Sequence, residues 1–483
     1  MAMSALKLSG LEPAAVFSYF EEICGIPHGS GNTKQISDYL VRFAQDHGIR
    51  YEQDELNNVV MYQEGTCGME DHEPVILQGH MDMVCEKDAD CPVNLETDGL
   101  NIDHDGQCVF AHGTTLGGDN GIAVAYCLAL LADKTIAHPP LEIIITVDEE
   151  TGMEGAAGVD LSRLKGRRMI NLDSEDEGIF TVACAGGARA KLTLPVERRP
   201  VYGPCVQLTV EGLRGGHSGV EIHKNRMNAN KAMANLLLRI VRIMPISMIS
   251  INGGSKDNAI PRSCRVKAVL LGHDAERIND ICAQLQKELR DTYDEPDLVI
   301  YGDNVDAMGG HALSVEQTRA VIALLINIPD GVQKWLDYDH QMVQTSLNMG
   351  IVKLDEEGFK MTFSVRSCVN QDKLDVLQML KNAAEKYGAH YAESGNYPAW
   401  EYKQESHLRD VMVAKFEQMY GKKPEVVAIH AGLECGLLSE KLPGLDCVSI
   451  GPDMHDIHTS RERLEIGSTR RTWEYLLEVL KEL

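Results

Sequence analysis

Short runs of apolar residues alternate with amphipathic stretches along the first part of the chain. The clearest run, residues 141–147, consists almost entirely of aliphatic and β-branched side chains, which predicts a strand buried on both faces. Two shorter runs and three stretches with helical spacing accompany it: 74–78 and 168–172, and 13–24, 32–47 and 121–132. Strands that alternate with helices predict an α/β fold in which a mixed, mostly parallel sheet is flanked by helices.

The pattern changes after residues 195–200, where the elements follow one another in a new order. Residues 205–301 predict the order β-α-β-β-α-β, with the second helix at 275–290, and this order is typical of ferredoxin-like domains. A similar but less complete pattern returns over residues 304–393. We therefore interpret residues 188–398 as one inserted α+β unit with two related, ferredoxin-like lobes.

The end of the chain, residues 399–483, returns to the α/β pattern and closes with a helix that begins at about residue 467. Because this segment is short, we assign it to the first domain rather than to a third one. The prediction is one domain in two sequence segments, 1–187 and 399–483, which the unit at 188–398 interrupts. A chain of 483 residues has room for two such domains.

Composition and charge narrow the range of functions. The chain is 44% hydrophobic, which is enough for large cores, and its net charge of -26 argues against nucleic acid and anionic membrane surfaces as partners. No apolar stretch is long enough to span a bilayer, and the N-terminus lacks the apolar segment of a signal peptide. The 13 cysteines form no C-x-x-C pair and are scattered, as in a reducing compartment. We expect a cytoplasmic protein without a membrane segment.

Residues that bind metals stand where the apolar runs end. Carboxylates and histidines at the ends of parallel strands gather at one edge of the sheet, where α/β folds form their ligand crevice. A further carboxylate opens the helix at 121–132, and two histidines lie in a late loop. The candidates are His80, Asp82, Asp119, Glu149, Glu150, Asp173, His455 and His458.

Each candidate also has a simple structural interpretation when it is taken alone. His80 and Asp82 resemble an ordinary histidine–carboxylate pair, and Asp119 suits a helix N-cap. The acidic turn after residue 147 suits a solvated loop, and the glycines around Asp119 lack the lysine of a phosphate-binding loop. Together, however, nitrogen and oxygen ligands from several strand ends suit two divalent metals that share a carboxylate. A free carboxylate beside them, Glu149, completes the equipment of metal-assisted hydrolysis.

Five motifs, in order along the chain, resemble those of the di-zinc peptidase family of aminoacylases, carboxypeptidases and carnosinases. They are G-H-M-D-M-V at 79–84, G-G-D-N-G at 117–121, D-E-E-T-G at 148–152, N-L-D-S-E at 171–175 and I-H-T-S-R-E at 457–462. The resemblance covers essentially the whole chain and is strongest to the branch of bacterial aminoacyl-histidine dipeptidases. It implies a catalytic domain in two segments and an inserted lid.

The resemblance also implies two Zn²⁺ per chain, with Mn²⁺ or Co²⁺ as substitutes. His80 and Asp173 match the ligands of one metal, Glu150 and His458 match the ligands of the other, and Asp119 matches the bridging carboxylate. His458 is preferred to His455 because the family's ligand directly precedes a Thr-x-x-Glu run.

Two further residues of the first domain match residues with roles in the reaction. Asp82 matches the residue that orients His80, and Glu149 matches the general base, which moves a proton from the attacking water to the leaving amine. The family pattern also predicts a cis peptide bond between Asp119 and Asn120.

Three residues of the inserted unit match substrate contacts of the family's lid. His217 matches a histidine that reaches the scissile carbonyl, and Asn258 and Arg366 match substrate-binding positions. Arg366 could hold the C-terminal carboxylate of a dipeptide with two parallel hydrogen bonds. The alternative for Arg366 is an exposed arginine at the end of a strand.

The function that follows is a cytoplasmic metallodipeptidase for unblocked dipeptides, including Xaa-His dipeptides such as β-alanyl-histidine. Two alternatives stay open: another amidohydrolase of the family, such as a tripeptide aminopeptidase or a deacetylase, and a non-catalytic dimerising relict. The relict is disfavoured because Glu149 and every ligand position are filled. The expected partner is a small peptide. A homodimer also stays open, since relatives dimerise through a smaller lid, which two lobes in one chain could replace.

Overall fold

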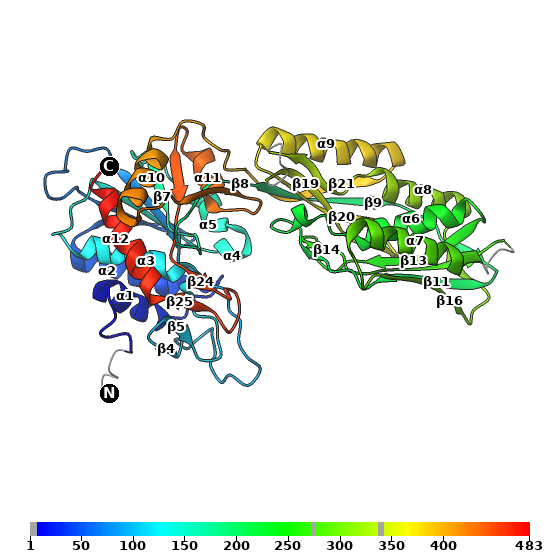
Figure 1. Ribbon diagram of the computed structural model, residues 1–483, viewed down its shortest axis with the longest axis horizontal. Coiled ribbons are helices and arrows are strands. Elements are labelled where there is room, and N and C mark those ends of the chain that lie inside the picture. The colour runs from blue at the N-terminus through cyan, green and yellow to red at the C-terminus, as the bar shows by residue number, and fades with distance from the viewer. Residues whose placement is uncertain (1–6, 273–276, 337–341) are drawn as a thin grey trace. The chain divides into compact units, whose positions relative to one another are not determined.

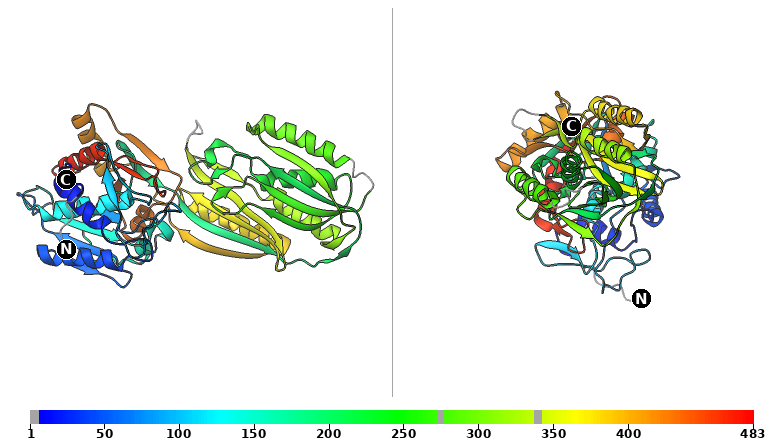
Figure 2. Two further views of the ribbon diagram at one scale, coloured as in Figure 1. Left: turned by 90° about the horizontal axis from the view of Figure 1, so that it is seen from below. Right: turned by 90° about the vertical axis from the view of Figure 1, so that its right-hand side faces the viewer.

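The computed structural model describes residues 7–272, 277–336 and 342–483 of the chain. This part forms two compact units, which are coloured along the chain in Figure 1 and Figure 2. The first unit comprises Met1–Ala183, Tyr402–Ala428 and Leu433–Leu483, and the second comprises Cys184–Glu401 and Ile429–Gly432.

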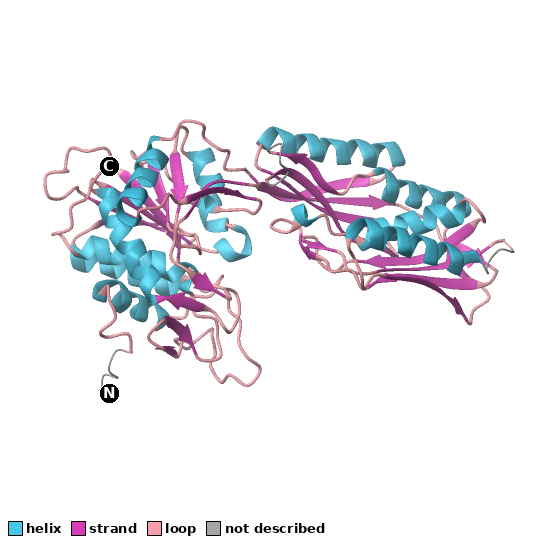
Figure 3. Cartoon of the chain, viewed as in Figure 1, coloured by secondary structure: helices cyan, strands magenta, loops and turns pink. Residues whose placement is uncertain are grey.

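An eight-stranded sheet with the order β1-β2-β6-β3-β7-β23-β8-β22 forms the centre of the first unit (Figure 3). The neighbouring strands β6, β3, β7 and β23 are parallel, whereas β1, β2 and β8 pair in antiparallel fashion. The mixed sheet with a parallel centre confirms the predicted fold class. The strands are β1 Arg50–Gln53, β2 Val59–Gln63, β3 Val75–His80, β6 Leu141–Thr146, β7 Arg168–Asn171, β8 Ile179–Cys184, β22 Glu425–Ile429 and β23 Asp446–Ser449.

Helices flank this sheet, as expected for strands without a solvated face. β3 and β6 are buried at every position, because helices cover the centre of the sheet. α3 packs against β3, α1 packs against α3, and α10 packs against both β23 and α12. The helices of this unit are α1 Ala14–Cys24, α2 Lys34–His47, α3 Gly118–Ala132, α4 Glu149–Gly152, α5 Glu154–Gly158, α10 His407–Tyr420, α11 Glu434–Lys441 and α12 Ile466–Leu480.

Gly79, next to the end of β3, allows α3 to approach the sheet closely. A Cβ atom at this position would lie 2.5 Å from Asn120 Oδ1 and 2.7 Å from Ala123 Cβ. Any larger residue would push the first turn of α3 away from the strand. The glycine therefore brings the start of α3 beside the end of β3.

A second, smaller sheet joins two distant parts of the first unit. Its order is β24-β25-β5-β4, and all its pairs are antiparallel. The strands are β4 Ile102–His104, β5 Cys108–Ala111, β24 Met454–His455 and β25 Arg463–Glu465. Sequence reasoning treated both regions as loops, because strands of two to four residues carry too few positions for a periodic pattern. The sheet anchors both ends of the late loop that contains His458.

A nine-stranded sheet runs through the second unit. Its order is β16-β11-β15-β13-β19-β20-β9-β21, and β18 pairs with β19 beside this path. The strands are β9 Gly186–Leu194, β11 Cys205–Glu211, β13 Ile246–Gly253, β15 Cys264–Leu270, β16 Val299–Val305, β18 Gly331–Trp335, β19 Val343–Asp355, β20 Gly358–Ser367 and β21 His390–Tyr397. The helices are α6 Ala229–Val241, α7 Arg277–Tyr293, α8 Val315–Asn327 and α9 Asn370–Tyr387. Shorter elements are β10 Arg199–Val201, β12 Gly216–His217, β14 Ala259–Ile260, β17 Gly310–Ala312 and a 3-10 turn, Ile222–Lys224.

The sheet consists of two lobes with the same strand order. In the first lobe the order β16-β11-β15-β13 places the fourth, first, third and second strands side by side, with α6 and α7 as the two helices. In the second lobe β21-β9-β20-β19 repeats that order, with α8 and α9. Both lobes therefore have the β-α-β-β-α-β topology expected of ferredoxin-like domains.

β9 explains why the second lobe looked incomplete in the sequence. β9 is the first strand of the second lobe, but it precedes the whole first lobe in the chain. The first lobe is therefore inserted between β9 and α8. Residues 188–194 do show the alternation of polar and apolar residues that marks a strand, and the burial of β9 alternates accordingly over most of its length. The sequence pattern does not assign this strand to its lobe, because the four strands of the lobe do not lie in one continuous segment of the chain.

The two lobes share one continuous sheet. Asn252 and Gly253 of β13 pair with Lys353 and Val352 of β19. The prediction of two related lobes in one unit agrees with this connection.

The boundaries of the second unit differ slightly from the predicted range 188–398. The unit begins at Cys184 and ends at Glu401, because β9 and β21 extend the sheet at both ends. The short segment Ile429–Gly432 also belongs to it, since Ala185 N donates to Ile429 O at 3.1 Å. Residues 275 and 276 of the predicted helix at 275–290 lie outside the described residues. None of the helices described is both long and apolar enough to cross a membrane.

Candidate functional site

The predicted metal-binding residues of the first unit come together at one edge of its sheet. His80 ends β3, Glu149 and Glu150 follow β6, and Asp173 follows β7. These three strands are parallel neighbours, so their carboxyl ends meet. Two residues from other elements join them: Asp119 at the start of α3 and His458 in the loop between β24 and β25.

His80 is the centre of a first group of donor atoms. Its Nε2 lies 3.2 Å from Asp119 Oδ1 and 3.4 Å from Asp173 Oδ1. Its Nδ1 lies 3.0 Å from the carbonyl oxygen of Asp82, which can only accept a hydrogen bond, so Nδ1 carries the proton. Nε2 therefore faces the two carboxylates, and when this nitrogen is unprotonated its lone pair is available to a metal ion.

His458 is the centre of a second group. Its Nε2 lies 3.2 Å from Asp119 Oδ2 and 3.0 Å from Glu150 Oε1. In each trio the donor atoms lie within 4.8 Å of one another. Asp119 belongs to both groups and turns one oxygen to each, which is the arrangement of a carboxylate shared by two cations.

The charges of the site fit divalent cations. Asp119, Asp173 and Glu150 have side chains at most 10% exposed, and burying a carboxylate without a cation is costly. In the part of the chain that the structure describes, these three carboxylates form ion pairs with histidines and with no lysine or arginine. Imidazole nitrogens and carboxylate oxygens are ligands that zinc and related divalent metals accept. The residues present therefore fit a pair of divalent metals.

The pKa values show the same excess of negative charge. Burial lowers the pKa of His80, but Asp173 and Asp119 outweigh burial and raise the pKa well above its ordinary value. Hydrogen bonds with Asp119 and Glu150 raise the pKa of His458 to about 10. Burial raises the pKa of Asp173 to about 6, although His80 opposes this shift. Positive charge is thus drawn into the site, and bound metal ions would satisfy the same demand.

Glu149 lies beside both groups. Its carboxylate is within 4.8 Å of donor atoms of His80 and Glu150, so distance alone would also allow it to bind a metal. Unlike Glu150, it forms no ion pair with either histidine among the residues described. Burial raises the pKa of Glu149 well above its ordinary value, an effect that His80 partly opposes. A carboxylate with a raised pKa next to a metal site is suited to accept a proton.

Asp82 connects His80 to the acidic turn that carries Glu149 and Glu150. Its carboxylate lies 3.4 Å from His80 Nδ1 and accepts a hydrogen bond from Glu149 N at 3.1 Å and a longer one from Glu150 N at 3.4 Å. The hydroxyl of Ser30 donates to the same carboxylate at 2.8 Å. Asp82 therefore contacts the ring of His80 and also fixes the backbone of the turn.

The backbone around Asp119 is held by two buried side chains. Asn120 donates to Leu172 O at 2.8 Å and accepts a hydrogen bond from His80 N at 3.1 Å, so it links α3 to the ends of β7 and β3. The Asp119–Asn120 peptide bond is cis, which confirms the expectation from the family pattern.

Glu462 is a second buried anchor for this backbone, and sequence reasoning assigned no role to it. Its Oε2 accepts from Leu116 N at 2.7 Å and from Gly117 N at 3.1 Å, and its Oε1 accepts from Gly118 N at 2.8 Å and from Asp119 N at 3.4 Å. A carboxylate that receives four backbone N–H groups fixes the loop before α3. The only signal in the sequence was its place in the I-H-T-S-R-E motif, which does not reveal its partners.

Of the two late histidines, only one joins the carboxylates. His455 Nε2 lies 3.1 Å from Glu465 Oε1 on the neighbouring strand β25, and about half of its side chain is exposed. His458 lies in the second donor group. The geometry agrees with the choice of His458 over His455.

His217, in the second unit, presents one ring nitrogen as a hydrogen-bond donor. Its Nδ1 accepts from Gly219 N and Val220 N, both at 3.2 Å, so this nitrogen carries no proton. Burial and the charge of Arg366 lower the pKa of His217, which favours the neutral ring. The remaining nitrogen, Nε2, then carries the proton and can donate it to a ligand.

Arg366 lies near His217 and a second histidine that sequence reasoning did not name. Its Nη1 lies 3.2 Å from Tyr397 Oη, and its buried Nε has no hydrogen-bond partner among the described residues. His430 Nε2 lies 2.7 Å from Ser346 Oγ, on the strand that pairs with Arg366. Burial and Arg366 lower the pKa of His430 to about 3, so this ring is neutral.

Asn258 belongs to the same unit but is less firmly held. Its side chain is exposed, and its carbonyl oxygen accepts from Ser218 N at 2.9 Å, which connects its loop to the residue after His217. The preceding and following carbonyls, of Asp257 and Ala259, accept from the amide of Asn348.

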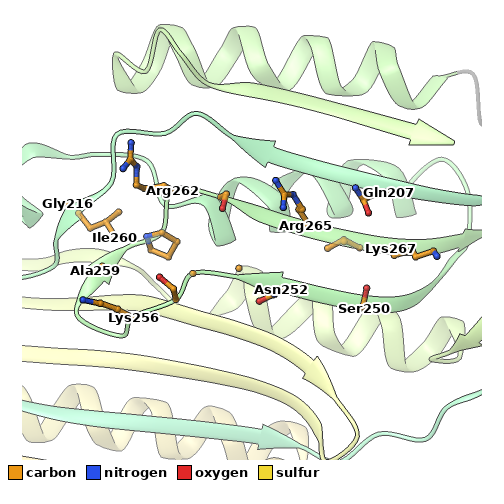
Figure 4. A pocket seen from close by; sticks show the side chains of 16 residues that line it. Gln207, Gly216, Ser250, Asn252, Lys256, Ala259, Ile260, Arg262, Arg265 and Lys267 are labelled. Carbon is orange, nitrogen blue, oxygen red and sulfur yellow. The ribbon is translucent and has the colours of Figure 1, made fainter. Parts of the chain in front are cut away.

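A separate cavity of about 630 Å³ lies on the sheet of the first lobe (Figure 4). Residues of β11, β13 and β15 and of the loop after β13 line it, and its charged residues are Lys256, Arg262, Arg265 and Lys267. None of the predicted site residues lines this cavity. Its basic side chains are not metal ligands, so the cavity is distinct from the donor groups described above.

Two donor groups that share one carboxylate, at the edge of an α/β sheet and beside a carboxylate with a raised pKa, are typical of metal-dependent hydrolases. The model of Peptidase family M20/M25/M40 matches residues 76–482, and the chain belongs to this family. It is therefore a peptidase of a metal-dependent family.

Individual relatives resemble the chain over its full length. The cytosol non-specific dipeptidase of Escherichia coli (strain K12) is 35% identical over 481 residues, which are 99% of each chain. The crystal structure of aminoacylhistidine dipeptidase from Vibrio alginolyticus is 36% identical, covers 99% of this chain and 98% of its own, and has a TM-score of 0.91. The aminopeptidase PepT from Bacillus cereus covers 98% of this chain with 16% identity and a TM-score of 0.55, which shows a shared fold alone.

Proposed function

We propose that the protein is a two-metal dipeptidase that hydrolyses unblocked dipeptides, including Xaa-His dipeptides such as β-alanyl-histidine. The observation that carries the proposal is Asp119, whose two oxygens face His80 and His458 separately, so that two cations can share it. The names of two full-length relatives, a non-specific dipeptidase and an aminoacylhistidine dipeptidase, support the choice of substrate.

The ligand sets follow from the two donor groups. His80, Asp173 and one oxygen of Asp119 would hold one metal, and Glu150, His458 and the other oxygen of Asp119 would hold the second. Two Zn²⁺ suit these ligands, and Mn²⁺ or Co²⁺ can replace them. When bound, such a pair lowers the pKa of a water molecule and polarises the scissile carbonyl.

Glu149 carries out the proton transfers of the reaction. Its raised pKa lets it take a proton from the attacking water and keep it until the peptide bond breaks. It then gives this proton to the nitrogen of the leaving amine. Asp82 supports both steps, because it holds the backbone of Glu149 and the ring of His80 in fixed positions.

The second unit supplies the contacts to the substrate. His217 Nε2–H can donate to the carbonyl oxygen as negative charge develops on it, since Nδ1 is already an acceptor. The guanidinium of Arg366 keeps a free N–H group and suits the C-terminal carboxylate of a dipeptide. Asn258 is exposed on the neighbouring loop and can bind the peptide backbone.

The cytosol is the compartment that we propose for this reaction. The name of the Escherichia coli relative supports it. No disulfide joins any cysteine in the described part of the chain, which agrees with a reducing environment.

The test combines metal reconstitution with a panel of substrates. Protein stripped with a chelator would be reloaded with Zn²⁺, Mn²⁺ or Co²⁺ and assayed on β-alanyl-histidine, alanyl-histidine, N-acetylated dipeptides and tripeptides. We expect two metal ions per chain and hydrolysis of the free dipeptides. Preference for a tripeptide or an acetylated substrate would establish another amidohydrolase of the family. Two bound metals without any hydrolysis would leave the non-catalytic relict.

A further inference from the structure

Four buried polar side chains form a hydrogen-bonded network behind the metal ligands. Asn171 Nδ2 donates to Gln78 Oε1 at 2.6 Å, and Gln78 Nε2 donates to Glu434 Oε2. Thr146 Oγ1 lies 2.6 Å from the same oxygen of Glu434. All four residues are fully buried. We call these residues, Asn171, Gln78, Thr146 and Glu434, the strand-end network.

Three residues of the network lie on the adjacent strands β6, β3 and β7, shortly before the metal-binding residues in the chain. Gln78 is two residues before His80 on β3, and Asn171 is two residues before Asp173 at the end of β7. Residues two apart on a strand point to the same face of the sheet. Gln78 pairs in register with Asn171, and His80 pairs with Thr146. A side chain that ties Gln78 to Thr146 therefore ties together the strands that carry the ligands.

Glu434 is an unusual residue for this position. It is the first residue of α11, it is fully buried, and among the described residues it forms no ion pair while its Oε1 has no hydrogen-bond partner. A buried carboxyl group without a cation is costly, so packing alone does not explain it. Its one partnered oxygen is aimed at the two side chains that connect β3 and β6.

The hydrogen bonds are consistent if Glu434 carries a proton. Burial raises the pKa of Glu434 to about 8, although His80 opposes the shift, so the acid is largely neutral at pH 7. Its Oε2–H can then donate to Thr146 Oγ1, and the hydroxyl of Thr146 can donate onward to Gly79 O at 3.2 Å. This carbonyl belongs to the residue before His80. The chain of hydrogen bonds therefore ends at the peptide group that joins Gly79 to the metal ligand His80.

We propose that Glu434 is a positioning residue for the metal centre: through Gln78 and Thr146 it holds the ends of β3, β6 and β7 at the spacing that the first donor group requires. Glu434 belongs to neither donor group among the described residues, and its partnered oxygen contacts Gln78 and Thr146 instead. The inference rests on the proposed function for the role of the metals. Outer partners of metal ligands typically change metal affinity or activity by about 10- to 100-fold when they are removed.

The experiment compares two substitutions of Glu434 with a matched control. Glu434→Gln keeps an oxygen that can accept hydrogen bonds from Gln78 Nε2 and the Thr146 hydroxyl, whereas Glu434→Ala removes the link. The control is Glu142→Ala, at the opposite end of β6, where a 5% exposed carboxylate accepts hydrogen bonds from Lys165 N and Gly166 N. Zn²⁺ affinity would be measured on the full-length protein by competition with a chromophoric chelator, and kcat and KM would be measured with saturating Zn²⁺.

We expect Glu434→Ala to lower the Zn²⁺ affinity of one of the two sites by about 10-fold or more. The Zn²⁺ affinities of Glu434→Gln should stay within about threefold of those of the wild type. KM should change little. Glu142→Ala should lower the melting temperature without changing Zn²⁺ affinity. The proposal is overturned if Glu434→Ala binds both Zn²⁺ ions as tightly as the wild type, or if Glu142→Ala weakens them equally.

A different outcome would show that the charge of Glu434 acts on the substrate. If Glu434→Gln raises KM as strongly as Glu434→Ala while Zn²⁺ affinity is unchanged, the residue binds the substrate and does not position the ligands. The affinity measurement needs no peptide, so it separates this inference from the proposed function. A wild-type protein that binds two Zn²⁺ ions but hydrolyses no dipeptide would contradict the function and leave the role of Glu434 intact.

Discussion

The candidate residues of the two units differ in how firmly their side chains are held. In the first unit, His80 has partners at both ring nitrogens and Asp119 has partners at both oxygens. In the second unit, Arg366 keeps an unpartnered Nε among the described residues, and Asn258 is exposed. Metal ligands must lie within a few tenths of an ångström of fixed positions, whereas residues that accept varied peptides benefit from freedom.

Because of this difference, substitutions in the two units should impair the enzyme in two different ways. Substitutions in the first unit should act on the metals or on the chemical step, because its side chains are already in place. Substitutions of the candidate residues in the second unit should leave the bound metals in place and act on contacts with the substrate, either with the bound peptide or with the charge that develops on its carbonyl oxygen. The following predictions test this division, from the largest expected effect to the smallest.

Glu149→Gln should cause the largest loss. A positioned general base contributes about 10²- to 10⁴-fold, so kcat should fall by at least this range while both metals stay bound. Steady-state kinetics together with metal analysis would measure it. The control is Glu154→Gln, which changes an exposed carboxylate five residues further along and should leave kcat unchanged. Turnover near the wild-type level in Glu149→Gln would exclude Glu149 as the base.

His217→Ala should cause the next largest loss. Removing one hydrogen-bond donor to a developing oxyanion costs about 10²- to 10³-fold in kcat, and the metal content should not change because His217 is not a ligand. His223→Ala, at an exposed position of the same loop, is the control. Full turnover in His217→Ala with both metals bound would break the proposed division of roles between the units.

Arg366→Lys should change binding rather than chemistry. Hydrogen bonds to charged groups contribute about 1.5–3 kcal/mol, so kcat/KM for free dipeptides should fall by roughly 10- to 100-fold. For dipeptide amides, which lack the carboxylate, kcat/KM should fall much less. The control Arg265→Lys, on the other lobe, should leave kcat/KM unchanged. Equal losses for acids and amides would show that Arg366 does not bind the carboxylate.

Asp330→Asn should have the smallest effect and should act on stability alone. Asp330 Oδ1 accepts from Met349 N and Asn228 Nδ2, and burial raises the pKa of its carboxyl to about 6 despite Lys231. Between about pH 4 and pH 6 the folded protein keeps a proton that the unfolded chain has released, so the stability of the wild type falls as pH rises through this window.

The asparagine variant lacks this titration and keeps an acceptor oxygen. When the pH is raised from 4 to 7, we expect the free energy of unfolding of the variant to increase by on the order of 1–2 kcal/mol relative to that of the wild type. Urea unfolding of both proteins at several pH values would measure the difference, in which the titration of all other groups cancels. A difference that does not depend on pH would show that Asp330 is charged in the folded protein.

The sequence predicted the parts of the fold that depend on periodic patterns. The apolar runs before His80, Glu149 and Asp173 form neighbouring parallel strands. Apolar strands of this kind are buried on both faces, which places them together at the centre of a parallel sheet. Residues 186–194 were missed even though their pattern is clear, since their lobe is interrupted by another lobe in the chain. Topology of this kind depends on contacts between distant segments, which a local pattern does not contain.

The site shows a similar limit. Residues at strand ends could be found from spacing, but the choice of His458 over His455 depended on the family motif. Glu434 and Glu462 escaped notice because nothing in a sequence shows that a particular glutamate is buried, and most glutamates are exposed. Only the fold reveals that these two acids lie behind the ligands.

The nested order of the chain also determines when the site can be completed during synthesis. His80, Asp119 and Asp173 are all translated before the second unit begins at Cys184, so every residue of the first donor group is present early in the chain. His458 follows only after both lobes have been made. β23, α10 and α12 of the first unit also follow the second unit in the chain, so the central sheet and its helix layer are completed at the same late stage. The second donor group can therefore be assembled only after both lobes have been made.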